Sequence, residues 1–206
     1  MQMNGTPSHA LAALLALMLP ALAVFFTAAD ADTLQRSDLP TAVVSDVIPT
    51  FSLDDVSDDV LWLARGAYSE TKQPHEQELV AWVLRNRVET GYRGERTYEG
   101  VVLDPYQFSA FNPGSSKRRL YTSLTADSDS RGWQRALEIA HTVYHSSPVH
   151  RPFPQTTRHF YSERSMVGRK APGWAEGEQP VRPVGFRVDP RRFRFYSGLA
   201  TAFVRL

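Results

Sequence analysis

The spacing of the apolar residues changes at Pro148, and this change limits the fold more than any other feature of the chain. Before Pro148, apolar residues recur every three to four positions, as they do along one face of an α-helix. Beyond it, short aromatic-rich segments partly alternate between apolar and polar residues, as β-strands do. The sequence therefore predicts one α+β domain, mainly helical, that ends in a small C-terminal antiparallel sheet.

Three helices are predicted in the first part of this domain. The first follows Ser57, a suitable N-cap, and has two aspartates in its first turn, where the helix dipole favours negative charge. The second begins at Pro74 and ends at Gly91, because proline suits a first helical turn and glycine suits the residue after the last one. The third covers 130–146, where Trp133 and later apolar residues form a stripe.

The remaining predicted elements are shorter. Between the second and third helices we expect one helical turn and then a loop that Pro105 and Pro113 interrupt. Strands are expected at "TTRHFYS" (156–162), "VGFRV" (184–188) and "RFRFYS" (192–197), with a long loop over 163–183.

An apolar run from Ala10 to Ala29 precedes the domain, and residues 29–31 follow the A-x-A pattern of a cleavage site. We expect residues 1–31 to be a secretory signal peptide. A run of this length could also span a bilayer as a retained anchor, but Pro20 in its middle favours cleavage.

The part of the chain that follows the signal is predicted to have two regions. Residues 32–56 contain prolines and scattered aspartates, which is typical of a linker or N-terminal arm. The domain itself is expected over 57–206. We expect the mature protein to be exported to the periplasm or cell wall, with no stable membrane insertion.

The composition narrows the possible chemistry. The chain has no cysteine, which excludes disulfides and a thiolate nucleophile. Its net charge is +1, but residues 38–59 contain six Asp and no Lys or Arg, whereas 151–206 contain eleven Lys or Arg and four Asp or Glu. A basic half is typical of proteins that bind an anionic polymer. Cell-wall glycan and nucleic acid both fit, as does a solvated basic surface, but export disfavours nucleic acid.

Glu70 is the first candidate for chemistry. It ends the first predicted helix, and Pro74 forces a turn close behind it. A glutamate at a helix end is usually only solvated. If Tyr68 and nearby aromatic rings shielded it, its pKa would rise and it could act as a general acid, which cleavage of a glycosidic bond requires.

The segment "YQFSAFN" (106–112) is the second candidate, because its polar residues alternate with aromatic rings. Gln107, Ser109 and Asn112 could bind sugar hydroxyl and acetamido groups, while rings such as Phe108 stack on sugar faces. An ordinary packed loop explains these residues equally well.

Histidines supply the remaining candidates. His159 lies in a predicted strand near Tyr161, and Trp174 lies in the long loop, which alone is a weak signal. His141 and His145 are four residues apart, the spacing of zinc-binding helices, but the glutamate of the HExxH motif is absent. We therefore predict no metal site and no cofactor.

Seven segments, in order over residues 57–198, resemble the cell-wall hydrolases of the spore-cortex-lytic (SleB/CwlJ) type. They read "AYSE", "LVAWVLRNRV", "YQFSAF", "WQRALEIAHTVY", "TTRHFYS", "APGWAEG" and "RFRFYS". After the first segment, this chain has Glu-Thr-Lys-Gln where the family usually has Glu-Ala-Arg-Gly-Glu, so the second acid of that motif is missing.

The resemblance implies a lysozyme-like fold and cleavage of peptidoglycan between N-acetylmuramic acid and N-acetylglucosamine. It places the catalytic glutamate at Glu70, the Gln-Phe-Ser loop at 107–109 and the family's histidine at His159. The expected route is lytic transglycosylation by a single glutamate, because 106–112 and 156–162 contain no acid that could act as a second carboxylate.

Substrate contacts are expected from eight residues: Tyr68, Gln107, Phe108, Ser109, Asn112, His159, Tyr161 and Trp174. The rival function is a non-catalytic peptidoglycan-binding protein with a lysozyme-like cleft, which the missing second acid of the motif suggests. In both cases the partner is the glycan strand, nucleic acid is not expected to bind, and a monomer is expected.

Overall fold

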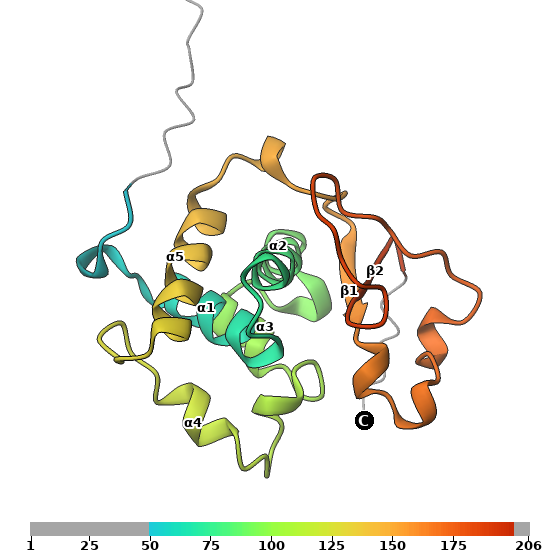
Figure 1. Cartoon of the computed structure of the whole chain (residues 1–206), viewed down its shortest axis with the longest axis horizontal. Coiled ribbons are helices and arrows are strands. Elements are labelled where there is room, and N and C mark those ends of the chain that lie inside the picture. Colours follow the sequence, from blue (N-terminus) through green and yellow to red (C-terminus); the bar gives the residue numbers. More distant parts are fainter. Residues whose placement is uncertain (1–49, 200–206) are drawn as a thin grey trace, which may run out of the picture. The chain divides into compact units, whose positions relative to one another are not determined.

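The fold was obtained as a computed structural model, which describes residues 50–199. Its helices are α1 (Asp58–Glu70), α2 (Pro74–Thr90), α3 (Tyr98–Leu103), α4 (Arg118–Thr122) and α5 (Arg131–His145), and its strands are β1 (Thr157–Tyr161) and β2 (Arg194–Ser197) (Figure 1). This order of helices followed by a two-stranded antiparallel sheet confirms the predicted α+β class. Within 50–199, no helix is long and apolar enough to cross a membrane.

The start of α1 and the ends of α2 follow the predicted local signals. The Ser57 hydroxyl accepts a hydrogen bond from the backbone N–H of Val60 at 3.3 Å, which caps α1. Pro74 is the first residue of α2, and Gly91 ends that helix in the left-handed conformation with a φ of 60°. These predictions are confirmed.

Helix α2 is the centre of the fold. Its residues Leu79–Leu84 are all buried, so this stretch is covered on every side, as in a core helix. It packs against α1, α3, α5 and β1, and Figure 1 shows it between the other helices and the sheet. Helix α1 approaches closely at Gly66, where an added Cβ would lie only 2.8 Å from Leu84 and Val102 side-chain carbons. This close packing fixes the direction of α1 and therefore the position of Glu70 at its end.

The connection between α3 and α5 contains one helix that the sequence did not indicate. Helix α4 is five residues long and mostly polar, so it has no clear apolar period. Tertiary contacts hold it instead: Tyr121 is buried and its ring lies 6.0 Å from that of Phe111. The expected helical turn before it is α3, and the loop around Pro105 and Pro113 is confirmed.

The sheet is smaller than predicted. Strands β1 and β2 pair antiparallel, with His159 opposite Tyr196 and Phe160 opposite Phe195. The predicted strand at 184–188 is wrong, because this segment forms a turn in which Gly185 has a φ of 80°. The backbone N–H of Val184 donates to the carbonyl of Pro152 at 2.8 Å, outside any strand.

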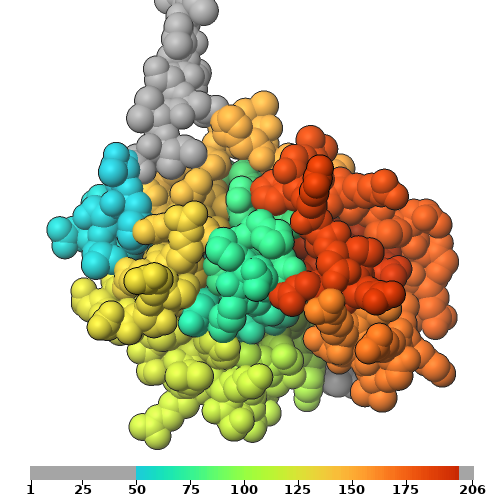
Figure 2. Space-filling model, viewed as in Figure 1, coloured from blue at the N-terminus to red at the C-terminus, as the bar shows by residue number. Residues whose placement is uncertain are grey.

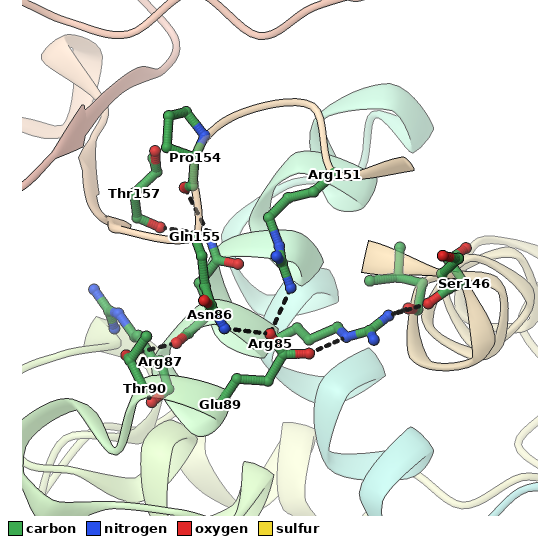
Figure 3. A network of polar contacts seen from close by, with 12 residues as sticks. Arg85, Asn86, Arg87, Glu89, Thr90, Ser146, Arg151, Pro154, Gln155 and Thr157 are labelled. Atoms are coloured by element: carbon green, nitrogen blue, oxygen red, sulfur yellow. Dashed lines mark hydrogen bonds and ion pairs between the residues drawn. The ribbon is translucent and has the colours of Figure 1, made fainter. Parts of the chain in front are cut away.

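A polar network joins the C-terminal half of α2 to α5 and to the sheet (Figure 3). The guanidinium of Arg85 donates to the carbonyls of Val143 and Ser146, both at 2.6 Å, at the end of α5. The amide of Asn86 donates to the carbonyl of Thr157 at 2.8 Å in β1. The adjacent Arg87 donates to the carbonyl of Arg158 at 2.8 Å. The C-terminal part, coloured orange to red in Figure 2, is thereby fixed against the helical part.

The predicted signal peptide, residues 1–31, lies outside the described residues. Only 50–56 of the expected arm are described, and they form a short 3-10 turn at Leu53–Asp55. Phe51 contacts His141 of α5 edge to face, with ring centroids 5.5 Å apart. This end of the arm therefore packs on the helical body and is not loose.

Candidate active site

Glu70 is the last residue of α1, and its carboxyl makes no hydrogen bond and no ion pair within residues 50–199. Desolvation by the atoms packed around it raises its pKa from 4.5 to about 7, although the positive charges of Arg87, Lys117 and Lys72 lower it. The negative end of the α1 dipole also disfavours a carboxylate at this position. A carboxyl in these surroundings retains its proton close to neutral pH.

Solvent can nevertheless reach Glu70. Its side chain is only partly buried, and it lines a pocket of about 190 Å³. The rest of the lining comes from the C-terminal part of the chain: Ser162, Arg164, Ser165, Arg192 and Phe193. Glu70 is the only acid in this lining, so the residues that surround the pocket supply no second carboxylate.

A second glutamate, Glu76, lies six residues further along the chain at the start of α2, in very different surroundings. Its two carboxylate oxygens accept hydrogen bonds from Arg192 at 2.5 and 2.7 Å, and the hydroxyl of Thr71 donates to it at 2.6 Å. Burial alone would raise its pKa, but the bonds from Arg192 and Thr71 lower the pKa below its usual value. Glu76 is therefore held ionised, as part of the support for the α1–α2 turn.

The ring of Tyr68 packs against aromatic residues of α4 and α5. Its ring contacts those of Trp133 and Tyr121 edge to face, with centroids 5.6 and 6.1 Å away. The ammonium of Lys72 lies 3.2 Å from the centroid of the Tyr68 ring. Because this face of the ring is covered, the structure gives Tyr68 a supporting position below Lys72.

The loop at 106–112 separates into buried and accessible residues. Phe108 is 1% exposed and packs against Phe160 of β1, so its ring is a core element whose faces are not open to a sugar. The side-chain oxygen of Asn112 accepts the backbone N–H of Tyr106 at 2.9 Å and stabilises the positive φ of 67° there. Gln107 and Ser109 are accessible, and their side chains make no hydrogen bond within the described residues.

The predicted residues His159, Tyr161 and Trp174 do come together. The ring of Trp174 lies 5.2 Å from His159 and 5.8 Å from Tyr161, and Tyr196 completes the cluster at 5.5 Å. Trp174 is 41% exposed, whereas Tyr161 is buried. The cluster therefore presents the indole to solvent, and Tyr161 directly precedes Ser162 of the Glu70 pocket.

His159 is held neutral in this cluster. Its Nε2 atom is 2.9 Å from the hydroxyl of Tyr92, and its Nδ1 atom is buried without a partner. Desolvation and, to a smaller extent, the charges of Arg87 and Arg158 together lower its pKa to about 4. A neutral, half-buried imidazole positions its aromatic neighbours and carries no charge toward a substrate.

Arg87 is a site residue to which the sequence analysis assigned no role. Its guanidinium lies between the rings of Tyr92 and Phe108, at 5.1 and 5.4 Å, and it interacts electrostatically with both Glu70 and His159. The only signal was its place in the Asn-Arg-Val end of the second helix. Arg164 and Arg192 gave no signal, because they reach the pocket only through tertiary structure.

The histidine pair of α5 was the candidate for a metal site. The rings of His141 and His145 lie 4.4 Å apart, and both ring nitrogens of His141 are buried without a partner. Across residues 50–199, no group of three or more His, Cys, Asp or Glu side chains is arranged to hold a metal ion.

The sequence matches no protein-family model, no curated protein and no solved structure. The resemblance to the spore-cortex-lytic hydrolases therefore stays a hypothesis that rests on the seven segments themselves.

Proposed function

We propose that this protein cleaves the glycan strand of peptidoglycan between N-acetylmuramic acid and N-acetylglucosamine, as a lytic transglycosylase with a lysozyme-like fold. The observation that carries the proposal is the state of Glu70. An acid with a pKa of about 7, without a partner and in a solvent-accessible pocket, has the properties of a general acid near neutral pH. Comparable glycosidases use such a carboxylic acid on the leaving oxygen.

The proposed reaction needs only this one carboxyl. Glu70 donates its proton to the glycosidic oxygen, and the bond from that oxygen to C1 of the muramic acid breaks. The resulting carboxylate then takes the proton of the 6-hydroxyl of the same sugar, whose oxygen bonds to C1. One bond breaks and one forms, the proton returns to Glu70, and no water is consumed.

The absence of a second acid in the pocket supports this route over hydrolysis. A two-carboxylate hydrolase needs its second acid within about 5–10 Å of the first. Glu76 is bound by Arg192, and Glu163 is bound by Arg194 at 2.7 Å, so both neighbouring acids already have cationic partners.

The substrate contacts are proposed on the accessible polar and aromatic groups. Among residues 50–199, the side chains of Gln107 and Ser109 have no hydrogen-bond partner, so they can donate hydrogen bonds to sugar substituents or accept them. The exposed indole of Trp174 offers a ring for stacking, and His159 and Tyr161 support it from below. The side-chain oxygen of Asn112 already accepts the backbone N–H of Tyr106. Asn112 therefore contributes by positioning the loop.

Mass spectrometry of digested peptidoglycan tests the proposal. The purified protein is expected to release fragments that end in 1,6-anhydro-muramic acid. Fragments with a reducing end would show hydrolysis instead. Sedimentation with sacculi, without release of any fragment, would overturn the catalytic proposal and favour a peptidoglycan-binding protein.

A further inference from the structure

The surroundings of Glu70 contain more positive charge than the proposed reaction uses. Five cations lie in its pocket or interact with it electrostatically: Lys72, Arg87, Lys117, Arg164 and Arg192. Positive charge stabilises the carboxylate that Glu70 becomes, but it opposes the positive charge that develops at C1 of the sugar as its bond breaks. These cations therefore need another explanation.

Three of these five cations already interact with other groups of the protein. Arg192 forms its ion pair with Glu76, and Arg164 forms one with Asp189 at 2.8 Å. Arg87 is buried between aromatic rings and donates to a backbone carbonyl. The charges of Arg192 and Arg164 are therefore already balanced by an acid, and that of Arg87 is enclosed by aromatic rings.

Lys72 and Lys117 differ from these three arginines. Lys72 and Lys117 are exposed, and neither forms an ion pair with an acid anywhere in 50–199. Lys117 caps α4, one turn before Tyr121, whose backbone N–H donates to the Lys117 carbonyl at 3.1 Å and whose hydroxyl accepts from Lys72 at 3.2 Å. The two lysines therefore belong to the same corner of the fold, and each interacts electrostatically with Glu70. Desolvation and the charge of Lys117 lower the pKa of Lys72 to about 8. Two like charges beside a protonated acid repel each other, and a bound anion would relieve that repulsion.

Lys72 is also held in place, which a solvated surface lysine is not. Its ammonium lies 3.2 Å from the Tyr68 ring centroid, 3.2 Å from the Tyr121 hydroxyl, and within hydrogen-bond distance of the Tyr68 carbonyl. The hydroxyl, the carbonyl and the ring face together fix the position of this positive charge. Because the side chain is ordered in advance, binding costs little conformational entropy.

We propose that Lys72 and Lys117 form a carboxylate subsite that binds the acidic substituent of the muramic acid next to the cleaved bond. This assignment rests on the proposed function. A glycan strand of N-acetylated sugars is neutral, and its carboxylates are on the lactyl group of muramic acid or on the peptide attached there. The sugar whose C1 reacts at Glu70 carries that lactyl group, so its carboxylate lies within reach of side chains beside Glu70.

The test compares three soluble glycan substrates of equal length. One carries acidic peptides, one has the peptides removed so that the lactyl carboxylate is free, and one has every carboxylate converted to a methylamide. The protein variants are Lys72→Met/Lys117→Met, each of the two single substitutions and, as a control that matches the charge change of a single substitution, Lys170→Met. Lys170 is exposed and does not interact with Glu70.

The double variant is expected to raise KM about tenfold on a carboxylate-bearing substrate, since each lysine contributes a partly exposed charge contact. Its KM on the methylamide should equal that of the unmodified protein, and the difference should shrink as salt is added. Loss on the peptide-bearing strand alone assigns the subsite to the peptide, whereas loss on the peptide-free strand assigns it to the lactyl group. Lys170→Met should change nothing.

Two further variants separate binding from folding. Lys72→Arg/Lys117→Arg keeps both charges and should restore most of the lost affinity. Lys117→Met alone removes an exposed side chain, and it should show part of the effect with an unchanged melting temperature. Equal KM changes on acidic and methylamide strands would overturn the subsite alone. Failure of the unmodified protein to cleave any strand would overturn the proposed function, and the subsite with it.

Discussion

Glu70 and Glu76 are six residues apart in sequence, yet the fold treats them in opposite ways. Glu70 ends α1, its carboxyl has no partner among residues 50–199, and desolvation raises its pKa to about 7. Glu76 lies in the first turn of α2 and accepts two hydrogen bonds from Arg192. These bonds and that of the Thr71 hydroxyl keep the pKa of Glu76 below the usual value despite its burial. The comparison shows that burial does not decide the role of a carboxyl. Its partners do: one glutamate is left able to donate a proton, and the other stabilises the turn that holds it.

The largest effect is expected for the activity of Glu70→Gln. The amide keeps the shape of the side chain but cannot donate a proton, and general acid–base catalysis is worth about 10²–10⁴-fold. The variant should lose at least about a hundredfold in release of peptidoglycan fragments. It should still sediment with sacculi and keep its melting temperature at acidic pH. Undiminished release by the folded variant would make Glu70 a structural residue, and the contrast with Glu76 would lose its functional meaning.

Glu76→Gln is expected to act on stability. It leaves Arg192, whose side chain is 34% exposed, beside a neutral group, and loss of this ion pair is expected to cost about 1–3 kcal/mol. Because the folded-state pKa of Glu76 is lowered, the stabilisation is present above the usual pKa and is lost as the pH falls below it. Urea unfolding at neutral and at acidic pH measures this. Glu138→Gln, in the exposed pair with Arg135, is the control and should cost under about 1 kcal/mol.

The same glutamine substitution at Glu70 should have the opposite effect on stability. A carboxyl whose folded pKa is raised disfavours the folded state once the pH exceeds the unfolded value of 4.5, and increasingly so up to about 7. At about pH 8, Glu70→Gln should therefore be more stable than the unmodified protein by about 1–3 kcal/mol. At about pH 4, where the carboxyl is protonated in both states, the two should unfold alike. A variant that is less stable at both pH values would contradict the assignment.

The smallest effect is expected at Gln107. Its side chain has no partner in the described residues, so Gln107→Ala removes a substrate contact and no internal one. Loss of one hydrogen bond costs about 1–1.5 kcal/mol, which corresponds to about a tenfold loss of kcat/KM. The melting temperature should stay within about a degree or two. A large fall in melting temperature with normal activity would make the loop structural.

The features of the fold that depend only on residues close together in the sequence were predictable. The Ser57 cap, the proline at the start of α2 and the glycine at its end are local, and each lies where it was expected. The predicted strand at 184–188 was wrong because Gly185 bends the backbone, although the residues around it have high β-propensity. Helix α4 was missed because it is held by tertiary contacts and not by an apolar face.

The candidate site was also predictable only in part, because contacts between distant parts of the chain gave no signal. Glu70 was predicted as the candidate acid because it ends an apolar helix, and that role stays a prediction. The rings of His159, Tyr161 and Trp174, which were grouped as one candidate, do lie together. The partner of Glu76 lies 116 residues away, and no pattern in the sequence connects the two. Phe108 shows the opposite error, because the sequence predicted it as a substrate contact and the fold places it in the core. An aromatic ring in a polar loop fits sugar stacking, and only the fold shows that this ring is 1% exposed.

The most direct test of the central claim is to titrate the two carboxyls side by side by NMR of the side-chain carboxyl carbons, using Glu70→Gln and Glu76→Gln to assign the signals. We expect the Glu70 signal to titrate with a midpoint of about 7, and the Glu76 signal to titrate below the usual value of 4.5. A Glu70 midpoint at or below 4.5 would show that this carboxyl is ionised at neutral pH, and it would contradict its assignment as the proton donor.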